Sequence, residues 1–209
     1  MRLRKTPGVA EAIKSYEDIV FLRGHTGGEL MKQDQLELEV GTGRGTFLAT
    51  LAAQRPDSFF VGIDYQTEVL YYAARKIREQ ALKNVRLIEG DAAGLEHWFG
   101  AGQISAVYIN FCDPWPKARH VKRRLISRVF LEKYRKVVKS DAKLYFKTDN
   151  GQLFAFALEE FTACGLNIIS KTEDLRCSGY KNPGVTEYEL KFYKLGMPVY
   201  FCEAAFSGT

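Results

Sequence analysis

Short apolar runs alternate with longer amphipathic segments along most of the chain, and this alternation most constrains its fold. Seven runs rich in β-branched and aromatic residues predict strands at 36–40, 59–63, 85–88, 104–111, 142–147, 166–170 and 199–206. Segments with apolar residues at helical spacing predict helices at 46–54, 67–82, 123–138 and 152–164. Strands that alternate with helices form βαβ units around a mostly parallel sheet, so we expect an α/β fold.

The first 35 residues lack this alternation. They are polar and interrupted by glycines, and we expect an N-terminal arm with a short helix over 1–35. With 209 residues and 46% hydrophobic content, the chain is large enough for one full core. We therefore expect a single domain over 36–209.

Cysteine usage and hydropathy indicate the cellular setting. The four cysteines are far apart, with no Cys-x-x-Cys pair and no Cys/His cluster at metal-ligand spacing. No apolar run approaches the roughly 20 residues of a membrane span, and no apolar stretch follows the basic start. We expect a cytoplasmic protein with reduced thiols, without a metal site, a signal peptide or an association with membranes.

Acidic residues stand at the ends of five predicted strands, or directly after them: Glu39, Asp64, Asp91, Asp113 and Asp149. Ligands of open α/β sheets bind outside the carboxyl ends of the strands. We therefore expect these carboxylates to gather along one edge of the sheet. A helix N-cap explains any single aspartate equally well, but it does not explain all five.

A glycine-rich loop links the first strand to the first helix and contains Gly41, Gly43 and Gly45. Glycines there let a ligand approach the backbone, and the helix N-terminus attracts negative groups. The third glycine is misplaced for the dinucleotide fingerprint Gly-x-Gly-x-x-Gly, and Glu39 would repel a pyrophosphate. Glu39 suits an amino group instead, which S-adenosylmethionine carries together with a carboxylate. A tight turn without a ligand is the alternative.

The next two acids complete the expected cofactor site. Asp64, at the end of the second strand, is placed to bind ribose hydroxyls, a feature shared with NAD enzymes. Asp91, followed by Ala92, is placed to contact the adenine edge.

A dense basic run follows Asp113 and the Pro-Trp-Pro turn at 114–116. Its six positive residues outnumber the net charge of +5 of the whole chain: Lys117, Arg119, Lys122, Arg123, Arg124 and Arg128. Positive charge concentrated beside a carboxylate and Trp115 indicates a polyanionic substrate at a reactive site. A solvated helix face is the alternative for the run, and a core position is the alternative for Trp115.

Four segments together resemble the bacterial tRNA (guanine-N7-)-methyltransferases: Glu39–Gly45, Asn110–Leu125, Phe146–Asn150 and Thr186–Glu189, the last followed by Lys191 and Phe192. The match runs in order from about residue 36 to 206. It implies a Rossmann-like class I methyltransferase fold, with a seven-stranded, mostly parallel sheet, the last strand antiparallel and helices on both faces. It also implies methyl transfer from S-adenosylmethionine to N7 of the variable-loop guanosine at tRNA position 46.

The resemblance assigns roles to individual residues. Cofactor contacts fall on Glu39, Asp64, Asp91 and Asp113. Substrate contacts fall on Lys117, Arg119, His120, Val121, Lys122, Arg123, Arg124, Asp149, Thr186, Glu187, Tyr188 and Glu189. Two departures from the family pattern are Asp64, where glutamate is usual, and Ala118, which replaces a common lysine.

Guanine N7 carries a lone pair and no proton, so its methylation requires no general base. The enzyme must position the reactants and stabilise the positive charge that develops on the guanine. We predict Asp113 as the catalytic carboxylate, with Asp149 as second choice, and Trp115 as a stacking platform for the base. Thr186 and Glu189 also match a capping box, which predicts a helix starting there.

The sequence is also compatible with other functions. A class I methyltransferase acting on another RNA, a small molecule or a protein would share the fold. An NAD-dependent reductase and a non-catalytic RNA-binding module are further alternatives. The oligomeric state is open between a monomer and a homodimer.

Overall fold

The computed structural model describes residues 7–23, 36–180 and 182–207, so the expected arm is covered only over 7–23. Its strands are β1 (Val20–Phe21), β2 (Leu36–Val40), β3 (Phe59–Asp64), β4 (Val85–Glu89), β5 (Ile104–Asn110), β6 (Val138–Thr148), β7 (Leu166–Thr172) and β8 (Tyr200–Phe206). Its α-helices are α1 (Val9–Ala12), α2 (Thr46–Gln54), α3 (Thr67–Glu79), α4 (Arg128–Arg135), α5 (Gly151–Ala163) and α6 (Glu187–Lys194). Short 3-10 turns are η1 (Ile13–Tyr16), η3 (Ala92–His97), η4 (Ala118–Arg123) and η5 (Leu175–Cys177).

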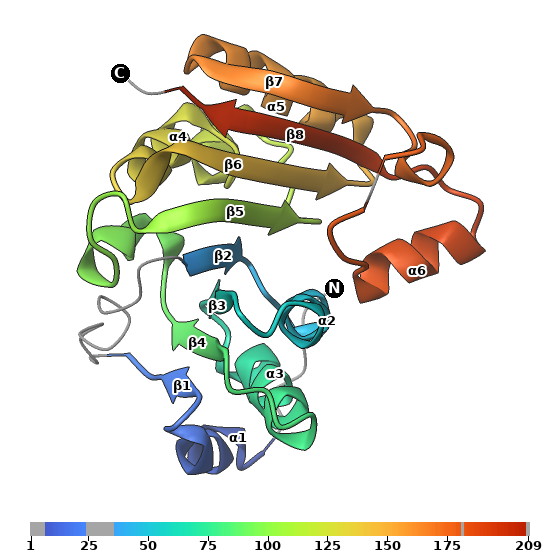
Figure 1. Cartoon of the computed structure of the whole chain (residues 1–209). Coiled ribbons are helices and arrows are strands. Elements are labelled where there is room, and N and C mark those ends of the chain that lie inside the picture. The colour runs from blue at the N-terminus through green and yellow to red at the C-terminus, as the bar shows by residue number, and fades with distance from the viewer. Residues whose placement is uncertain (1–6, 24–35, 181, 208–209) are drawn as a thin grey trace.

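The strands form one sheet in the order β1-β4-β3-β2-β5-β6-β8-β7 (Figure 1). Neighbouring strands are parallel from β1 to β6, whereas β8 runs antiparallel to both β6 and β7. The mostly parallel α/β sheet and its antiparallel last strand are therefore confirmed.

The described part of the sheet contains eight strands, whereas the sequence predicted seven. The additional strand is β1, where Val20 pairs with Leu87 and Phe21 with Ile88. Both residues of β1 are buried, and the preceding α1 and η1 pack against α3. A strand of two residues is too short to show an alternating pattern, which is why sequence periodicity does not predict β1.

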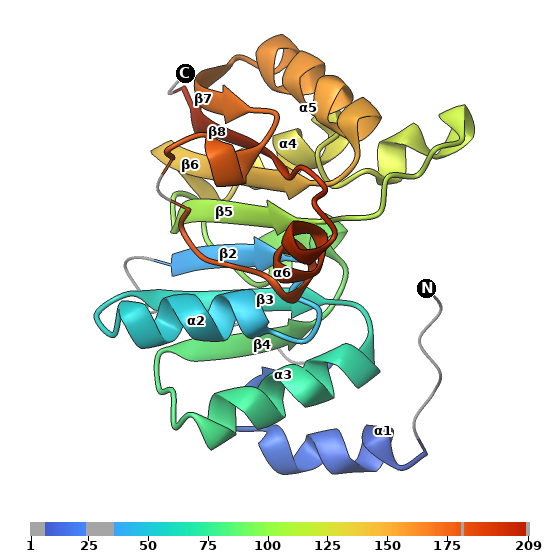
Figure 2. The same cartoon turned by 90° about the vertical axis from the view of Figure 1, so that its right-hand side faces the viewer.

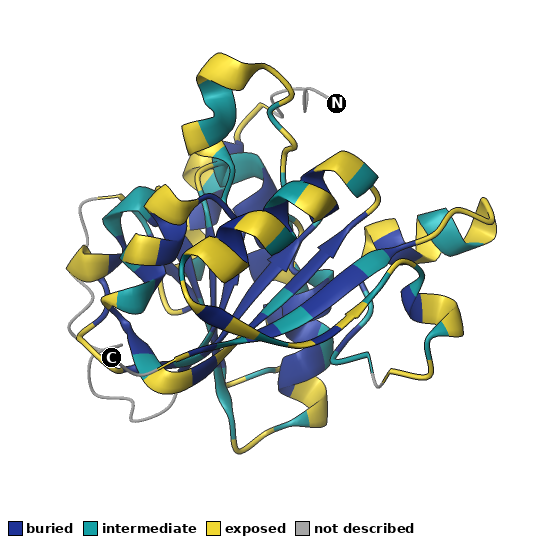
Figure 3. Ribbon diagram, turned by 90° about the horizontal axis from the view of Figure 1, so that it is seen from above, coloured by how far each residue is buried: buried dark blue, intermediate teal, exposed yellow. Residues whose placement is uncertain are grey.

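Helices cover both faces of the sheet, as expected. The pleat of each strand sends alternate side chains to opposite faces. Phe60 therefore packs with α2 and α3, while its neighbour Val61 packs with the core beneath α4 and α5. Figure 2 shows the helices on either side, and Figure 3 shows buried strands between helices whose outer surfaces are exposed.

The predicted helix at 123–138 is wrong at its start, because α4 begins only at Arg128. The preceding basic residues form the 3-10 turn η4, and the backbone is then extended at Arg124 and at the N-cap Ser127. Leu125 and Ile126 lie in the turn between these two residues, which the N–H of Ser127 closes on the carbonyl of Arg124 at 2.9 Å, and they pack against the core from there. Because both residues are apolar, they match the spacing of buried residues on a helix, although they lie before the helix begins.

The predicted capped helix at Thr186 is confirmed as α6. Thr186 Oγ1 accepts a hydrogen bond from the backbone N–H of Glu189 at 2.9 Å, and Glu189 Oε2 accepts one from the backbone N–H of Thr186 at 3.4 Å. This reciprocal capping box fixes where α6 begins. Figure 1 shows α6 beyond the carboxyl ends of β5 and β6.

No helix within the described ranges combines the length and the apolar character that a membrane crossing requires.

Candidate functional site

A cavity of about 1100 Å³ opens at the carboxyl ends of the central strands. Its walls come from the glycine loop between β2 and α2, the loops after β3, β4 and β5, the turn η4, and the start of α6. This is the edge at which α/β sheets bind ligands. In Figure 2 the yellow-green turn η4 projects beyond the body of the domain.

All residues predicted to contact the cofactor line this cavity: Glu39, Gly41, Gly43, Gly45, Asp64, Asp91, Ala92 and Asp113. Four of the five strand-end acids are thus brought together. Asp149, the fifth, is exposed and does not line the cavity.

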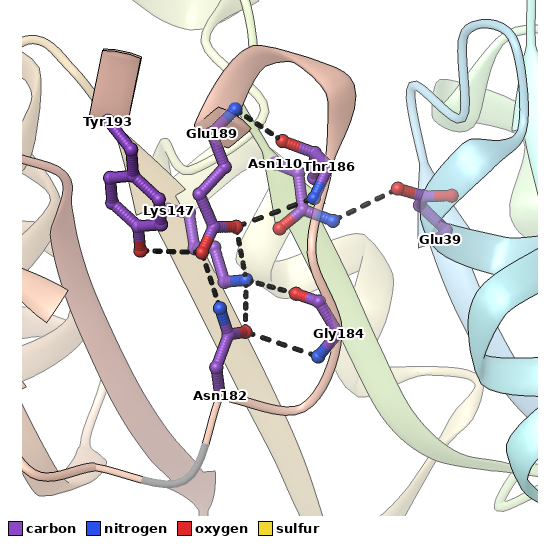
Figure 4. A network of polar contacts seen from close by, with 8 residues as sticks. All are labelled: Glu39, Asn110, Lys147, Asn182, Gly184, Thr186, Glu189 and Tyr193. Carbon is purple, nitrogen blue, oxygen red and sulfur yellow. Dashed lines mark hydrogen bonds and ion pairs between the residues drawn. The ribbon is translucent and has the colours of Figure 1, made fainter. Parts of the chain in front are cut away.

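Glu39 is the most buried acid of the cavity, with 2% of its surface exposed. Thr42 Oγ1 donates a hydrogen bond to its Oε2 at 2.7 Å. Asn110 Nδ2 donates one to its Oε1 at 2.9 Å, as Figure 4 shows. Burial nevertheless raises the pKa of Glu39 to about 7, because desolvation outweighs these bonds and the nearby Lys147. A positive charge arriving in the cavity would favour its ionised form.

The glycine loop needs its third glycine for packing. Gly45 has a left-handed φ of 70° and is the N-cap residue of α2. A Cβ at this position would lie 2.7 Å from the Cβ of Ala73 on α3. Gly45 therefore lets the start of α2, which lines the cavity, pack closely against α3.

Asp64 and Asp91 are both held by backbone N–H groups. Asp64 accepts hydrogen bonds from Gly43 at 3.1 Å and from Gln66 at 3.0 Å. Burial raises the pKa of Asp64, and the charge of the nearby Asp113 adds to the increase. Asp91 caps η3 by accepting from the N–H of Ala93 at 2.8 Å, and it remains exposed.

The carboxylate of Asp113 is exposed and makes no hydrogen bond or ion pair with any residue that the structure describes. The backbone on either side of it is strained. Phe111 and Trp115 have φ values of 50° and 41°, in the left-handed region that bulky residues rarely adopt. The loop therefore presents a free carboxylate from a backbone that the surrounding structure must hold in place.

Aromatic rings line two sides of the cavity. Trp115 stacks on His120 with ring centroids 5.6 Å apart, and the Cζ of Arg123 lies 5.1 Å from the Trp115 ring. On the α6 side, the exposed Tyr188 stacks on Phe111 at 5.9 Å. Trp115 is half-buried, so it is neither a core residue nor a free ring.

The predicted substrate residues divide into two sets. Five of them line the cavity: Lys122, Arg123, Thr186, Glu187 and Tyr188. Seven do not: Lys117, Arg119, His120, Val121, Arg124, Asp149 and Glu189.

Glu189 in particular does not line the cavity, because its side chain is fully buried. It pairs with Lys147 and accepts hydrogen bonds from Asn182 and from the hydroxyl of Tyr193 (Figure 4). Three of the six basic residues after Asp113 also bind their own chain, and one of them is Arg119, whose Nε donates to His120 Nε2 at 3.0 Å. Arg128 pairs with Glu160 at 3.0 Å, and Arg124 donates to backbone carbonyls.

Sequence reasoning missed Asn110 and Lys147 as parts of the site. Asn110 ends β5, lines the cavity and donates to Glu39, while its Oδ1 is buried without a hydrogen-bond partner in the described structure. Lys147 lies in an otherwise apolar part of β6 and is fully buried. The sequence did contain a signal for Lys147. A lysine within an apolar strand is expected to be buried, and a buried charge requires a partner of opposite charge.

Comparison with known proteins supports a methyltransferase fold. Residues 33–202 match the family model described as "Putative methyltransferase". A SAM-dependent methyltransferase from Aquifex aeolicus superposes with a TM-score of 0.59 at 17% identity, covering 96% of this chain and 94% of that one. A 16S rRNA methyltransferase superposes with a TM-score of 0.62 at 14% identity, covering 86% and 92%.

Relatives in sequence share nearly the whole chain. The tRNA (guanine-N(7)-)-methyltransferase of Streptococcus mutans is 38% identical over 99% of this chain and 100% of its own. The enzyme of that name from Clostridioides difficile is 40% identical over 98% of both chains. The chain therefore belongs to the tRNA (guanine-N(7)-)-methyltransferase family.

Proposed function

We propose that this protein transfers a methyl group from S-adenosylmethionine to N7 of a guanosine in the variable loop of tRNA, at tRNA position 46. The observation that carries the proposal is the position of Asp113. Its carboxylate, which has no hydrogen bond or ion pair among the described residues, lines the same cavity as the glycine loop and Glu39, and the basic turn η4 begins shortly after it. The part of the cavity that fits the cofactor and the basic surface that fits a polyanion therefore meet at the carboxylate of Asp113.

The cavity residues fit S-adenosylmethionine, which supplies an electrophilic methyl group on a sulfonium sulfur. Glu39 supplies a carboxylate suited to an ammonium group, and Asn110 supplies a suitable acceptor in its Oδ1, which has no hydrogen-bond partner among the described residues. The start of α2 suits a carboxylate. Asp64 suits the ribose hydroxyls, because each of its oxygens retains a lone pair beyond its backbone bond.

Asp113 acts on the guanine in this proposal. N7 needs no deprotonation, but methylation makes the ring cationic and its N1 proton more acidic. A carboxylate that accepts a hydrogen bond from the Watson–Crick edge stabilises this charge. Asp113 is the better candidate than Asp149, because it lines the cavity and has no other partner among the described residues.

The tRNA side consists of the outward-facing part of η4 and the start of α6. Lys122 and Arg123 line the cavity, and neither forms an ion pair with a described residue. The target base has to leave its stack to reach such a site. The exposed ring of Tyr188 offers it a stacking surface opposite η4.

The test is incubation of the protein with S-adenosylmethionine and unmodified tRNA, followed by nucleoside mass spectrometry. We expect 7-methylguanosine with tRNA that carries guanosine at position 46, and none with tRNA in which adenosine replaces it. Cofactor binding without methylated tRNA would contradict the proposal and favour another RNA, a small molecule or a protein as substrate.

A further inference from the structure

Arg124 lies among the basic residues expected to contact tRNA, yet its guanidinium turns toward the protein. Its Nε donates a hydrogen bond to the carbonyl of Pro114 at 2.9 Å, and its Nη2 donates one to the carbonyl of Trp115 at 3.2 Å. Its Cζ lies 4.3 Å from the centre of the Phe156 ring on α5. Arg124 does not line the cavity. Its contacts therefore join the loop after β5 to a helix of the domain body.

The two carbonyls that Arg124 binds directly follow Asp113. The loop is held at its other end by the N–H of Phe111, which donates to the carbonyl of Lys147 at 2.8 Å. Phe111 and Trp115 both have left-handed φ values, which persist only where the surroundings fix them. Arg124 supplies that restraint at the Trp115 end.

We propose that Arg124 is a positioning residue, which fixes the Asp113–Trp115 loop against α5 so that the Asp113 carboxylate faces the cavity. It binds no tRNA phosphate. This inference rests on the proposed function, in which Asp113 stabilises the methylated guanine.

The geometry requires an arginine. A planar guanidinium can donate to two carbonyls in succession while one face rests on an aromatic ring, whereas a lysine ammonium is a point charge on a flexible stem. Arg124→Lys therefore keeps the positive charge and loses the restraint. At a phosphate contact the same substitution would keep most of the electrostatic contribution.

Arg123 provides a matched comparison, because it carries the same charge next along the chain and its side chain lines the cavity. We would measure kcat and the dependence of tRNA affinity on salt for Arg124→Lys, Arg124→Gln and Arg123→Gln. Both Arg124 variants should lose kcat by roughly 10- to 100-fold, because the reacting groups are misplaced. Their log–log salt slopes should equal that of the wild type, whereas Arg123→Gln should reduce the slope by about one.

Fluorescence gives a readout that does not depend on activity. The chain has two tryptophans, and Trp98 is buried, so Trp98→Phe leaves Trp115 as the reporter. In this background Arg124→Lys should make Trp115 more accessible to acrylamide quenching, with wild-type affinity for S-adenosylmethionine showing that the variant is folded. This measurement remains valid even if the wild type methylates no tRNA.

Two results would overturn the inference. One is wild-type kcat and wild-type quenching in Arg124→Lys. The other is a salt slope reduced by about one in Arg124→Gln, which would identify Arg124 as a phosphate ligand.

Discussion

Lys147 and Glu189 form an ion pair in which both side chains are fully buried, with Nζ 2.9 Å from Oε2 (Figure 4). Glu189 is the one buried residue of α6, a helix that the structure describes in full. The remaining N–H groups of Lys147 donate to Asn182 Oδ1 and to the carbonyl of Gly184, both at 2.5 Å. This buried ion pair therefore holds α6, which forms one wall of the cavity, against β6.

Removing one partner of this pair should destabilise the protein strongly. Lys147→Met leaves the Glu189 carboxylate buried without its cation, and we expect a loss of about 3–5 kcal/mol in the free energy of unfolding. Urea denaturation measures this loss. In a double-mutant cycle with Glu189→Gln the two losses should not add, because each substitution removes the same interaction. Additive losses would show that the residues act independently.

Binding of S-adenosylmethionine should strengthen as pH rises toward 7. In the unliganded protein, burial raises the pKa of Glu39 from its ordinary 4.5 to about 7, so this residue is largely protonated below that value. A cationic amino group favours the ionised form, so affinity should increase by at most about tenfold per pH unit between roughly pH 5 and 7, then level off. Isothermal titration calorimetry in buffers of different ionisation enthalpy would detect the proton released on binding.

The same shift has an opposite effect on the stability of the unliganded protein. A carboxyl group whose pKa is raised by folding contributes stability below its unfolded pKa of 4.5, and this contribution is lost as pH rises through about 7. Glu39→Gln should remove both pH dependences. A pH-independent affinity in the unmodified protein would contradict the assignment of Glu39 to the amino group.

tRNA affinity should fall with salt at a log–log slope of roughly −2 to −3. Of the six basic residues after Asp113, Arg124 and Arg128 are held by carbonyls or a carboxylate of their own chain, and Arg119 donates its Nε to His120. About three phosphate contacts from the groups that remain give this slope. Lys122→Gln should reduce the slope by about one, and fluorescence anisotropy with labelled tRNA measures it. Arg128→Gln is the matched control, since Arg128 pairs with Glu160, and it should leave the slope unchanged. An equal change in both variants would identify general electrostatics instead of individual contacts.

The sequence predicted the sheet well, because its strands are long enough for their apolar character to be recognised. It missed β1, since two residues carry no period, and it extended the helix of α4 back to Arg123 because Leu125 and Ile126 imitate helical spacing. Both errors concern the bounds or the presence of single elements, which sequence periodicity predicts only locally. They leave the carboxyl edge of the sheet, and therefore the position of the site, unaffected.

Individual roles were harder to predict than the position of the site. The sequence grouped Arg123 with Arg124, although one side chain lines the cavity and the other binds carbonyls. It also placed Glu189 at the substrate, whereas the side chain is buried against Lys147. Charge and spacing do not indicate which way a side chain turns. That direction depends on partners distant in sequence, such as Phe156 for Arg124.

Asp113→Asn and Asp149→Asn should separate the two acids that the sequence left as candidates for catalysis. Asp113 lines the cavity with a carboxylate that has no partner in the described ranges, whereas Asp149 is exposed outside the cavity. An amide cannot neutralise a cationic guanine, so we expect Asp113→Asn to lower kcat by roughly 100- to 1000-fold while tRNA affinity is retained. Asp149→Asn should lower kcat far less. Single-turnover methylation of tRNA by each variant measures the difference, and a larger loss in Asp149→Asn would transfer the catalytic role to Asp149.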